Sequence, residues 1–361
     1  MLVVLGNNIP QSFREHFNAR AKDPASNLEL LGVQNDNFPN SEARPDLFAG
    51  ETPEQFAAND KKLKGQPVTI IQSLTKNETE TVNEIAFKLL ATVRNLKRHG
   101  AGEITVAMPF AAFARQDRDF AGQHLSVMGD DFPFLLKAAG ADRVITAEMH
   151  SKAAEKFYTD HFGAENVTFL SLAELYAQNL LGAGLKKDDI VLGAPDGADK
   201  PGDAGIRRAH ELGDAIWHAD NTENHYFKIG KKRNGSETKL MSFTGDVAGH
   251  IGVIVDDMSD SGGTIIHAAQ AQKEHGAAAT RVYLAHGLFN EKAIERVLTE
   301  KAADGTPAVD SVVVADTVPG LSEKFAAASK VYPNRITTLN VAPLFEREIM
   351  RKMLPPVQSA A

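Results

Sequence analysis

Short apolar runs alternate with helix-patterned stretches along most of this chain. The runs that predict β-strands are residues 68–71, 104–108, 144–147, 190–192, 251–255, 281–285, 311–315 and 336–339. The stretches between them that predict helices include residues 81–97, 131–139, 172–181 and 204–219. Strands that alternate with helices in this way favour parallel α/β sheets joined by right-handed crossovers.

The length of the chain predicts more than one such sheet. At about 150 residues per domain, 361 residues suggest two domains. We place the boundary near Gly163, so that residues 1–163 form an N-terminal α/β domain and residues 164–345 form a second one. Residues 346–361 are expected to form a C-terminal helix and tail.

The segment 251–264, IGVIVDDMSDSGGT, is the most informative stretch. A β-branched apolar strand ends in two carboxylates, and ligands bind at the carboxyl ends of strands in parallel sheets. The residues expected to wrap their backbone N–H groups around a phosphate are Asp260, Ser261, Gly262, Gly263 and Thr264. A helix beginning near Ile265 would point its positive end at the same anion.

Asp256 and Asp257 precede that loop, and they cannot bind the phosphate because their charges would repel it. They are expected to face hydroxyl groups or a divalent cation, and ribose hydroxyls fit that requirement. The alternative is an ordinary strand-to-helix turn whose Asp, Ser and Gly residues are only caps. Paired aspartates followed by SDSGGT favour the ligand site. This run resembles the phosphoribosyl-diphosphate motif of type I phosphoribosyltransferases and ribose-phosphate pyrophosphokinases.

Composition narrows the class of protein. The formal net charge of −8 argues against a nucleic-acid-binding protein, and the absence of cysteine excludes disulfides and thiolate nucleophiles. The opening MLVVLG is too short and uncharged for a signal peptide, and no apolar run approaches the roughly 20 residues of a membrane span. These features predict a soluble cytoplasmic enzyme that does not act at a membrane.

A second motif distinguishes between the two families. Residues 110–118, FAAFARQDR, follow the strand ITVAMP and resemble the YARQDR nucleotide-binding segment of ribose-phosphate pyrophosphokinases. Other landmarks similar to those of that family recur in order along the chain: VTIIQS, EMHSKAAEKFY, GAPDGA, KKR, GDV, AHGLF and DTVP. The chain is therefore identified as a divergent member of this family.

The resemblance implies two tandem phosphoribosyltransferase-type domains, each a mainly parallel sheet flanked by helices. It implies transfer of the diphosphoryl group of ATP to the anomeric hydroxyl of ribose 5-phosphate. Lys231 and Arg233 would act in catalysis, and His150 and Asp196 would hold Mg²⁺. The ribose 5-phosphate site would comprise the two aspartates and the loop at 260–264. The residues expected to bind ATP are Phe38, Asn40, Ser41, Glu42, Arg115 and Gln116.

The loop at 38–42 resembles one that reaches the adenine site of a neighbouring subunit, which implies a homo-oligomer built from dimers and reaching a hexamer in this family. Asn40 stands where the family usually has aspartate. The polar stretch after Arg233, NGSETKLMSFTG, is predicted to be a loop that orders when substrate binds.

Two other functions remain open. A type I phosphoribosyltransferase would use the same sugar-phosphate loop, but ARQDR, KKR and the two-domain length speak against it. A non-catalytic regulatory homologue would keep the fold and lose the chemistry. Retention of His150, Asp196, Lys231 and Arg233 argues against that alternative.

Overall fold

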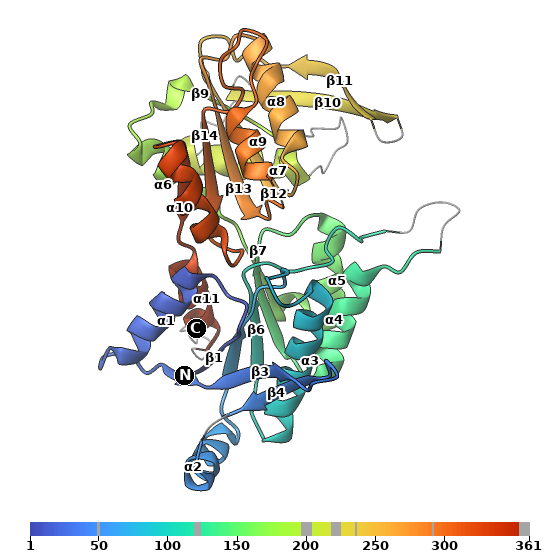
Figure 1. The fold of residues 1–361 in the computed structure, drawn as a ribbon, viewed down its shortest axis with the longest axis vertical. Coiled ribbons are helices and arrows are strands. Elements are labelled where there is room, and N and C mark those ends of the chain that lie inside the picture. The colour runs from blue at the N-terminus through green and yellow to red at the C-terminus, as the bar shows by residue number, and fades with distance from the viewer. Residues whose placement is uncertain are drawn as a thin grey trace, which may run out of the picture. The chain divides into compact units, whose positions relative to one another are not determined.

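The computed structural model describes residues 1–48, 51–118, 124–195, 204–217, 225–234, 237–290 and 292–353, without the side chains at 35, 231–234, 237–241 and 353. The chain divides into two compact units. Unit 1 comprises Met1–Leu170, Thr317–Gly320 and Asn340–Ala361. Unit 2 comprises Ser171–Asp316 and Leu321–Leu339. The elements of both are labelled in Figure 1.

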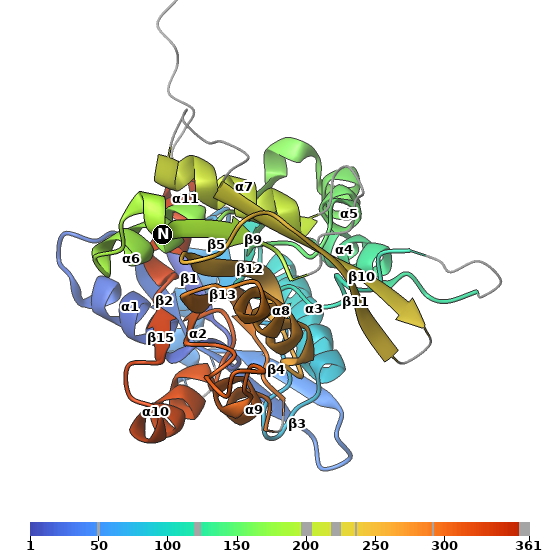
Figure 2. The ribbon, with the colours of Figure 1, turned by 90° about the horizontal axis from the view of Figure 1, so that it is seen from above.

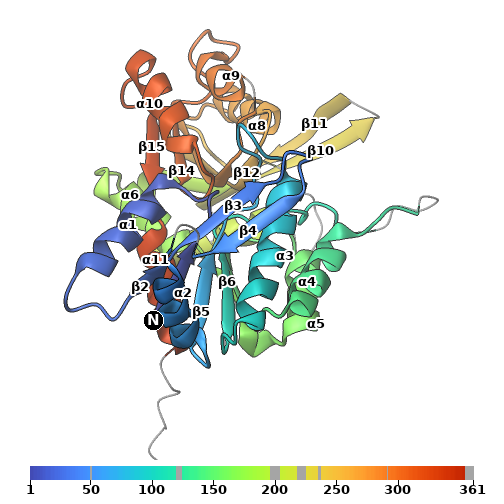
Figure 3. The ribbon, with the colours of Figure 1, turned by 60° about the horizontal axis from the view of Figure 1, so that its bottom comes forward.

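Unit 1 contains a sheet whose described strands are all parallel and follow the order β2-β1-β5-β6-β7-β8. The strands are β1 (Leu2–Leu5), β2 (Glu29–Leu31), β5 (Val68–Ile71), β6 (Ile104–Met108), β7 (Arg143–Ala147) and β8 (Val167–Leu170). The helices are α1 (Gln11–Lys22), α2 (Pro53–Leu63), α3 (Val82–Arg98), α4 (Met128–Ala139), α5 (Lys152–Phe162) and α11 (Ala342–Met353). An antiparallel hairpin of β3 (Val33–Asn37) and β4 (Ala43–Leu47) packs against α3 (Figure 3).

The order of the strands determines which helices cover which face. The chain moves outward from β1 to β2 in one direction and from β5 to β8 in the other. Because crossovers between parallel strands are right-handed, α1 covers one face of the sheet and α3, α4 and α5 cover the other (Figure 1). The predicted boundary near Gly163 lies just before β8, which hydrogen-bonds to β7 in this sheet. The domain limits remain a prediction.

The last described helix, α11, belongs to unit 1 although all of unit 2 precedes it in sequence. Phe345 is fully buried and packs edge-on against Phe13 of α1. The carboxylate of Glu346 accepts a hydrogen bond from Nε of Arg20 at 2.6 Å and lies 2.8 Å from Nε2 of His16. The apolar and ionic contacts together fix α11 on α1.

Unit 2 contains a larger sheet with the order β11-β10-β9-β12-β13-β14-β15, in which every described pair except β10–β11 is parallel. Its strands are β9 (Ile190–Gly193), β10 (Tyr226–Asn234), β11 (Glu237–Thr244), β12 (Ile251–Ser259), β13 (Ala279–Gly287), β14 (Ser311–Ala315) and β15 (Ile336–Leu339). Its helices are α6 (Ala173–Gly182), α7 (Ala204–Trp217), α8 (Gly263–Glu274), α9 (Ala293–Thr299) and α10 (Leu321–Val331).

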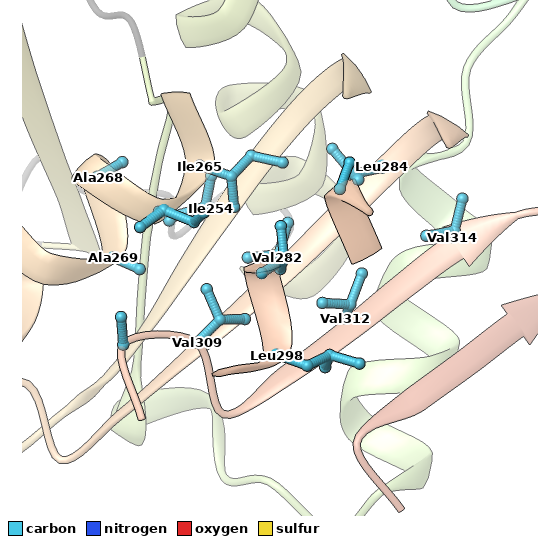
Figure 4. Packing of buried hydrophobic residues seen from close by; sticks show 14 of the residues in the cluster. Ile254, Ile265, Ala268, Ala269, Val282, Leu284, Leu298, Val309, Val312 and Val314 are labelled. Atoms are coloured by element: carbon cyan, nitrogen blue, oxygen red, sulfur yellow. The ribbon is translucent and has the colours of Figure 1, made fainter. Parts of the chain in front are cut away.

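Helices cover both faces of this sheet. Ile254, Val282 and Val312 of adjacent strands pack with Ile265 of α8 and Leu298 of α9 in one buried cluster (Figure 4). Tyr283 alternates to the opposite face, where its hydroxyl donates a 2.7 Å hydrogen bond to Asn179 of α6. The view in Figure 2 shows α7 and α8 on opposite sides of β12. Burial on both faces explains why the central strands are almost wholly apolar.

The predicted fold class is confirmed, since both units are helix-flanked, mainly parallel sheets. The predicted loop after Arg233 is wrong: residues 237–244 form β11, which pairs antiparallel with β10. Asn234 followed by Gly235 is a strong signal for a hairpin turn, and apolar and polar residues alternate from Met241 to Thr244. None of the helices in the described ranges has the length and apolar character needed to cross a lipid bilayer.

Candidate functional site

Asp256 and Asp257 lie within β12 rather than after it, because the strand continues to Ser259. The prediction that the strand ends at Val255 is wrong: pairing with β13 extends as far as Ser259 and Gly287. The strand order of unit 2 reverses between β9 and β12, since β10 lies on the other side of β9. Ligands bind at such a reversal, outside the carboxyl ends of the strands. The two aspartates therefore lie where a ligand is expected.

The two carboxylates have different surroundings. Asp257 is 4% exposed, and its Oδ1 lies 3.6 Å from Nη1 of Arg208, a buried residue of α7. Asp256 is half-buried, and its Oδ1 accepts a 2.9 Å hydrogen bond from the backbone N–H of Asp257. Burial and the adjacent charge of Asp257 raise the pKa of Asp256 well above its ordinary value, and Arg208 opposes this only in part. The folded structure therefore disfavours the ionised form of Asp256.

We expect Asp256→Asn to stabilise the folded protein at neutral pH. The folded state binds the Asp256 proton more tightly than the unfolded chain does, so stability falls as pH rises from the unfolded value near 3.8 through the raised folded value. Removing the carboxylate should raise the melting temperature at pH 8 by a few degrees, since about 1 kcal/mol corresponds to roughly 2–4 °C in a unit of this size. Melting curves at pH 8 and pH 4 test this.

The gain should shrink at pH 4, because Asp256 is then protonated in the folded state, so the folded protein no longer carries the unfavourable charge that the substitution removes. Asp257→Asn is the matched comparison: it should destabilise the protein, because it leaves the buried Arg208 without this carboxylate. A lower melting temperature for Asp256→Asn at pH 8 would contradict the expected pKa.

The loop that follows β12 is shaped for an anion. Gly262 has a φ of 78°, and a Cβ there would lie 2.5 Å from Cγ2 of Val297, so only glycine fits. Gly263 begins α8, and a Cβ there would meet nothing closer than Oγ of Ser261 at 3.8 Å. The N-cap of α8 makes no side-chain hydrogen bond. The first turn of the helix thus has no capping side chain from its N-cap residue, and the space beside Gly263 is open to an anion.

Neighbouring elements fix this loop from behind. Asn290 donates hydrogen bonds to Asp260 through its side-chain amide, which reaches the carboxylate, and through its backbone N–H at 3.1 Å. Nη1 of Arg296 in α9 donates to the carbonyl of Ser261 at 3.5 Å. Ser261 is exposed and Thr264 is half-buried. The loop is therefore held in place while its outer side remains accessible.

In unit 1, the ARQDR turn lies beside the loop that carries His150. The turn follows β6 and the histidine follows β7, and these strands are neighbours whose carboxyl ends share one edge of the sheet. Oγ of Ser151 donates a 2.6 Å hydrogen bond to Oδ2 of Asp117, and the same hydroxyl accepts from the N–H of Ala154 to cap α5. Ser151 thus links the two motifs, although 34 positions separate it from Asp117.

The side chains predicted to bind ATP from this turn are accessible. Arg115 and Gln116 are exposed, and His150 is half-buried. The backbone at Gln116 is fixed, because its carbonyl accepts a 3.1 Å hydrogen bond from Gly129 at the start of α4. A Cβ on Gly129 would lie 2.7 Å from that carbonyl oxygen, so glycine allows the close contact. The backbone of the turn is thus held in place, and the turn carries the exposed side chains of Arg115 and Gln116.

The predicted ATP-binding residues at 38–42 form the turn between β3 and β4. The N–H of Phe38 donates to the carbonyl of Glu42 at 2.8 Å, and Ser41 has a φ of 68°. Oδ1 of Asn40 accepts from the N–H of Glu42 at 3.3 Å. A depression of 340 Å³ adjoins the turn, lined by Phe38, Pro39, Asn40 and Glu42. Phe38 is 46% exposed, so this turn presents an aromatic ring at the surface.

Three predicted residues cannot be placed in full. Asp196 lies outside the described residues, as do the side chains of Lys231 and Arg233, whose backbone belongs to β10. The described chain reaches Pro195, shortly after Gly193 pairs with Ile254 of β12. Within the described ranges, no three His, Asp or Glu side chains are arranged to hold a metal ion.

The strand order of unit 1 also reverses, between β1 and β5, but buried amides fill that position. The side chain of Asn8 donates to the carbonyls of Ser73 at 3.1 Å and Thr75 at 2.5 Å. Gln72 donates to the carbonyl of Asn8 at 3.1 Å. A Cβ at Gly6 would lie 1.8 Å from Oε1 of Gln72. Among the described residues, the open strand-end site is therefore in unit 2, where the motif at 251–264 predicts it.

The chain thus belongs to the class of α/β proteins with two units, one of which carries an open glycine loop after paired aspartates. A family model for the N-terminal domain of ribose phosphate pyrophosphokinase matches residues 28–140. A model for the phosphoribosyl synthetase-associated domain matches residues 218–354. The chain belongs to the ribose-phosphate pyrophosphokinase family, as its motifs predict.

Individual relatives agree. A ribose-phosphate pyrophosphokinase from Hyphomonas neptunium is 30% identical over 302 residues, covering 82% of this chain and 85% of the relative. One from Chromobacterium violaceum is 31% identical over 292 residues, covering 81% and 78%. The crystal structure of phosphoribosylpyrophosphate synthetase from Mycobacterium smegmatis has the same fold, with a TM-score of 0.73 at 22% identity over 97% of this chain and 98% of that chain.

Proposed function

We propose that this enzyme transfers the diphosphoryl group of ATP to the anomeric hydroxyl of ribose 5-phosphate, giving 5-phosphoribosyl 1-diphosphate and AMP. The observation that carries the proposal is the open loop at Gly262 and Gly263 beside Asp256 and Asp257. Backbone N–H groups there suit a phosphate, and the carboxylates suit sugar hydroxyls. Membership of the pyrophosphokinase family supports the choice of reaction.

In this proposal unit 1 supplies the nucleotide site. The exposed guanidinium of Arg115 would pair with phosphate oxygens of ATP, and Gln116 beside it would hydrogen-bond to the nucleotide. The hydrogen bond between Asp117 and Ser151 joins this turn to the loop that carries His150. Lys231 and Arg233 would bind the transferring diphosphoryl group, because such a transfer depends on in-line positioning and neutralised charge. We place the reaction in the cytoplasm because its donor is ATP.

Mg²⁺ is the metal that this reaction implies. His150 and Asp196 would hold it, and His150 fits in being half-buried at the carboxyl end of β7, beside the turn that carries Arg115. An imidazole is an unusual partner for this cation, so the carboxylate of Asp196 would contribute more. The bound ion would neutralise charge on the phosphate oxygens of ATP. The protein's own part is to orient the nucleotide and the sugar.

The test is to incubate the purified protein with ATP, Mg²⁺ and ribose 5-phosphate and to measure AMP and 5-phosphoribosyl 1-diphosphate by chromatography. Equimolar formation of both products is expected. A type I phosphoribosyltransferase would instead consume 5-phosphoribosyl 1-diphosphate when a nucleobase is added. A regulatory homologue would bind the substrates and form neither product.

We further propose that the active unit is at least a dimer, because the exposed turn at Phe38 resembles one that completes a neighbouring subunit's nucleotide site. Light scattering under assay conditions should give a mass of two or more chains. An active monomer would contradict the proposal.

Subunit mixing gives a sharper form of the same prediction. Phe38→Ala and Lys231→Ala should each be defective alone, since one impairs the turn and the other the transferring site. When the two variants are coexpressed, mixed dimers should restore about a quarter of the sites, given random pairing about a two-fold axis. If activity stays at the level of the single variants, the turn does not act across subunits.

A further inference from the structure

Arg208 occupies a position in α7 where an apolar residue is expected. The buried residues of this helix recur every three or four positions and include Ala209, Leu212 and Ile216. Arg208 lies on the same buried face and is only 4% exposed. A guanidinium in such a place loses its hydration, which is costly unless a partner of opposite charge compensates. Its position therefore calls for a reason beyond packing.

The partner is Asp257 in β12. Nη1 of Arg208 lies 3.6 Å from Oδ1 of Asp257, and their side chains are 4% and 5% exposed. The adjacent Arg207 offers a contrast, since it pairs with Glu211 on the same helix at 2.7 Å with both side chains about a quarter to a third exposed. Surface pairs of that kind contribute little, whereas a buried charge depends strongly on its partner.

We infer that Arg208 is a positioning residue for the sugar site: it holds the Asp257 carboxylate at the carboxyl end of β12. This rests on the proposed function, in which Asp257 binds ribose hydroxyls. Arg208 acts through its contact with the Asp257 carboxylate. Its guanidinium attracts the carboxylate across 3.6 Å, and a planar, rigid guanidinium restrains that carboxylate better than a flexible ammonium would. The buried end of β12 also needs a cation, since Asp256 and Asp257 are adjacent there.

The experiment compares Arg208→Met, which removes the charge and keeps the length, with Arg208→Lys, which keeps the charge. Arg207→Met is the matched control on the same helix. The KM for ribose 5-phosphate and the KM for ATP are measured for each variant, and ribose 5-phosphate affinity is measured by calorimetry. Arg208→Met should raise the KM for ribose 5-phosphate about tenfold or more while leaving that for ATP within about twofold, as expected for loss of a charged partner. Arg208→Lys should lie between, and Arg207→Met should match the wild type.

The decisive comparison is made in an Asp257→Asn background. If Arg208 acts through Asp257, Arg208→Met should add no further loss of ribose 5-phosphate affinity there. A full additional loss, or an unchanged KM in the single variant, would overturn the inference. Should Arg208→Met fail to fold, Arg208→Lys decides: a selective rise in KM for the sugar supports the inference, and an equal rise for both substrates or no rise refutes it. If the wild type forms no AMP with ribose 5-phosphate, the proposed function fails. The inference about Arg208 is then tested only by the calorimetric affinity for ribose 5-phosphate.

Discussion

Lys231→Ala is expected to slow turnover by on the order of a hundredfold or more while leaving ribose 5-phosphate affinity nearly unchanged. A charge that acts on the transferring group contributes mainly in the transition state, so its loss lowers kcat rather than substrate binding. Residue 231 belongs to β10, whereas the sugar-phosphate loop follows β12, so the variant leaves that loop intact. Steady-state kinetics and calorimetry on the purified variant measure both effects.

The matched control is Lys232→Ala. It removes the same charge from the next position of β10, and adjacent residues of a strand belong to opposite faces of the hairpin. Lys232→Ala should therefore keep turnover within a few-fold of the wild type. Equal losses in the two variants would indicate that only the overall positive charge of the hairpin matters, and normal turnover in Lys231→Ala would refute its proposed catalytic role.

Gly263→Val is expected to weaken ribose 5-phosphate binding roughly tenfold or more, with much less effect on ATP. The side chain would enter the open space in front of the first N–H groups of α8, where the phosphate is proposed to bind. Loss of one or two charge-assisted hydrogen bonds accounts for the magnitude, at about 1.5–3 kcal/mol each. Calorimetric titration of each ligand gives the two affinities.

The geometry makes Gly263 a better test than Gly262. Gly262 needs its positive φ and its close contact with Val297, so a substitution there would disturb the fold itself. Gly263 has neither restriction. A Cβ on Gly182, at the end of α6, would have nothing within 4 Å, so Gly182→Val controls for adding a valine to an uncrowded glycine of unit 2. Equal loss of ATP and sugar affinity in folded Gly263→Val would show that the loop binds something else.

Local sequence patterns are sufficient to predict most of the central strands of the two main sheets. The strands at 68–71, 104–108, 311–315 and 336–339 have the predicted bounds. β1 and β8 are not among the predicted strands. β8 is mostly half-buried, so it lacks the continuous apolar character of the central strands. The hairpin of β10 and β11 is missed because its polar composition resembles that of a loop, although its turn signal is strong.

The candidate site also contains features that the sequence predicts and features that it does not. The phosphate loop could be predicted because Gly262, Gly263 and their neighbours are consecutive in sequence. Arg208 and Asp257 are 49 positions apart by number, and Ser151 and Asp117 are 34 positions apart. No local pattern relates such pairs, since crossovers of the sheets bring them together. Chemistry that depends on one segment is thus visible in a sequence, and chemistry that depends on packing is not.

The return of α11 to unit 1 has a consequence for biosynthesis. Unit 1 buries Phe345 and pairs Glu346 with Arg20, so its core is incomplete until this helix has left the ribosome. All of unit 2 has been synthesised by then. Although chains usually fold their N-terminal part first, this one should finish its first unit last, and a nascent chain stalled before residue 342 should expose the α1 surface around Phe13 to chaperones.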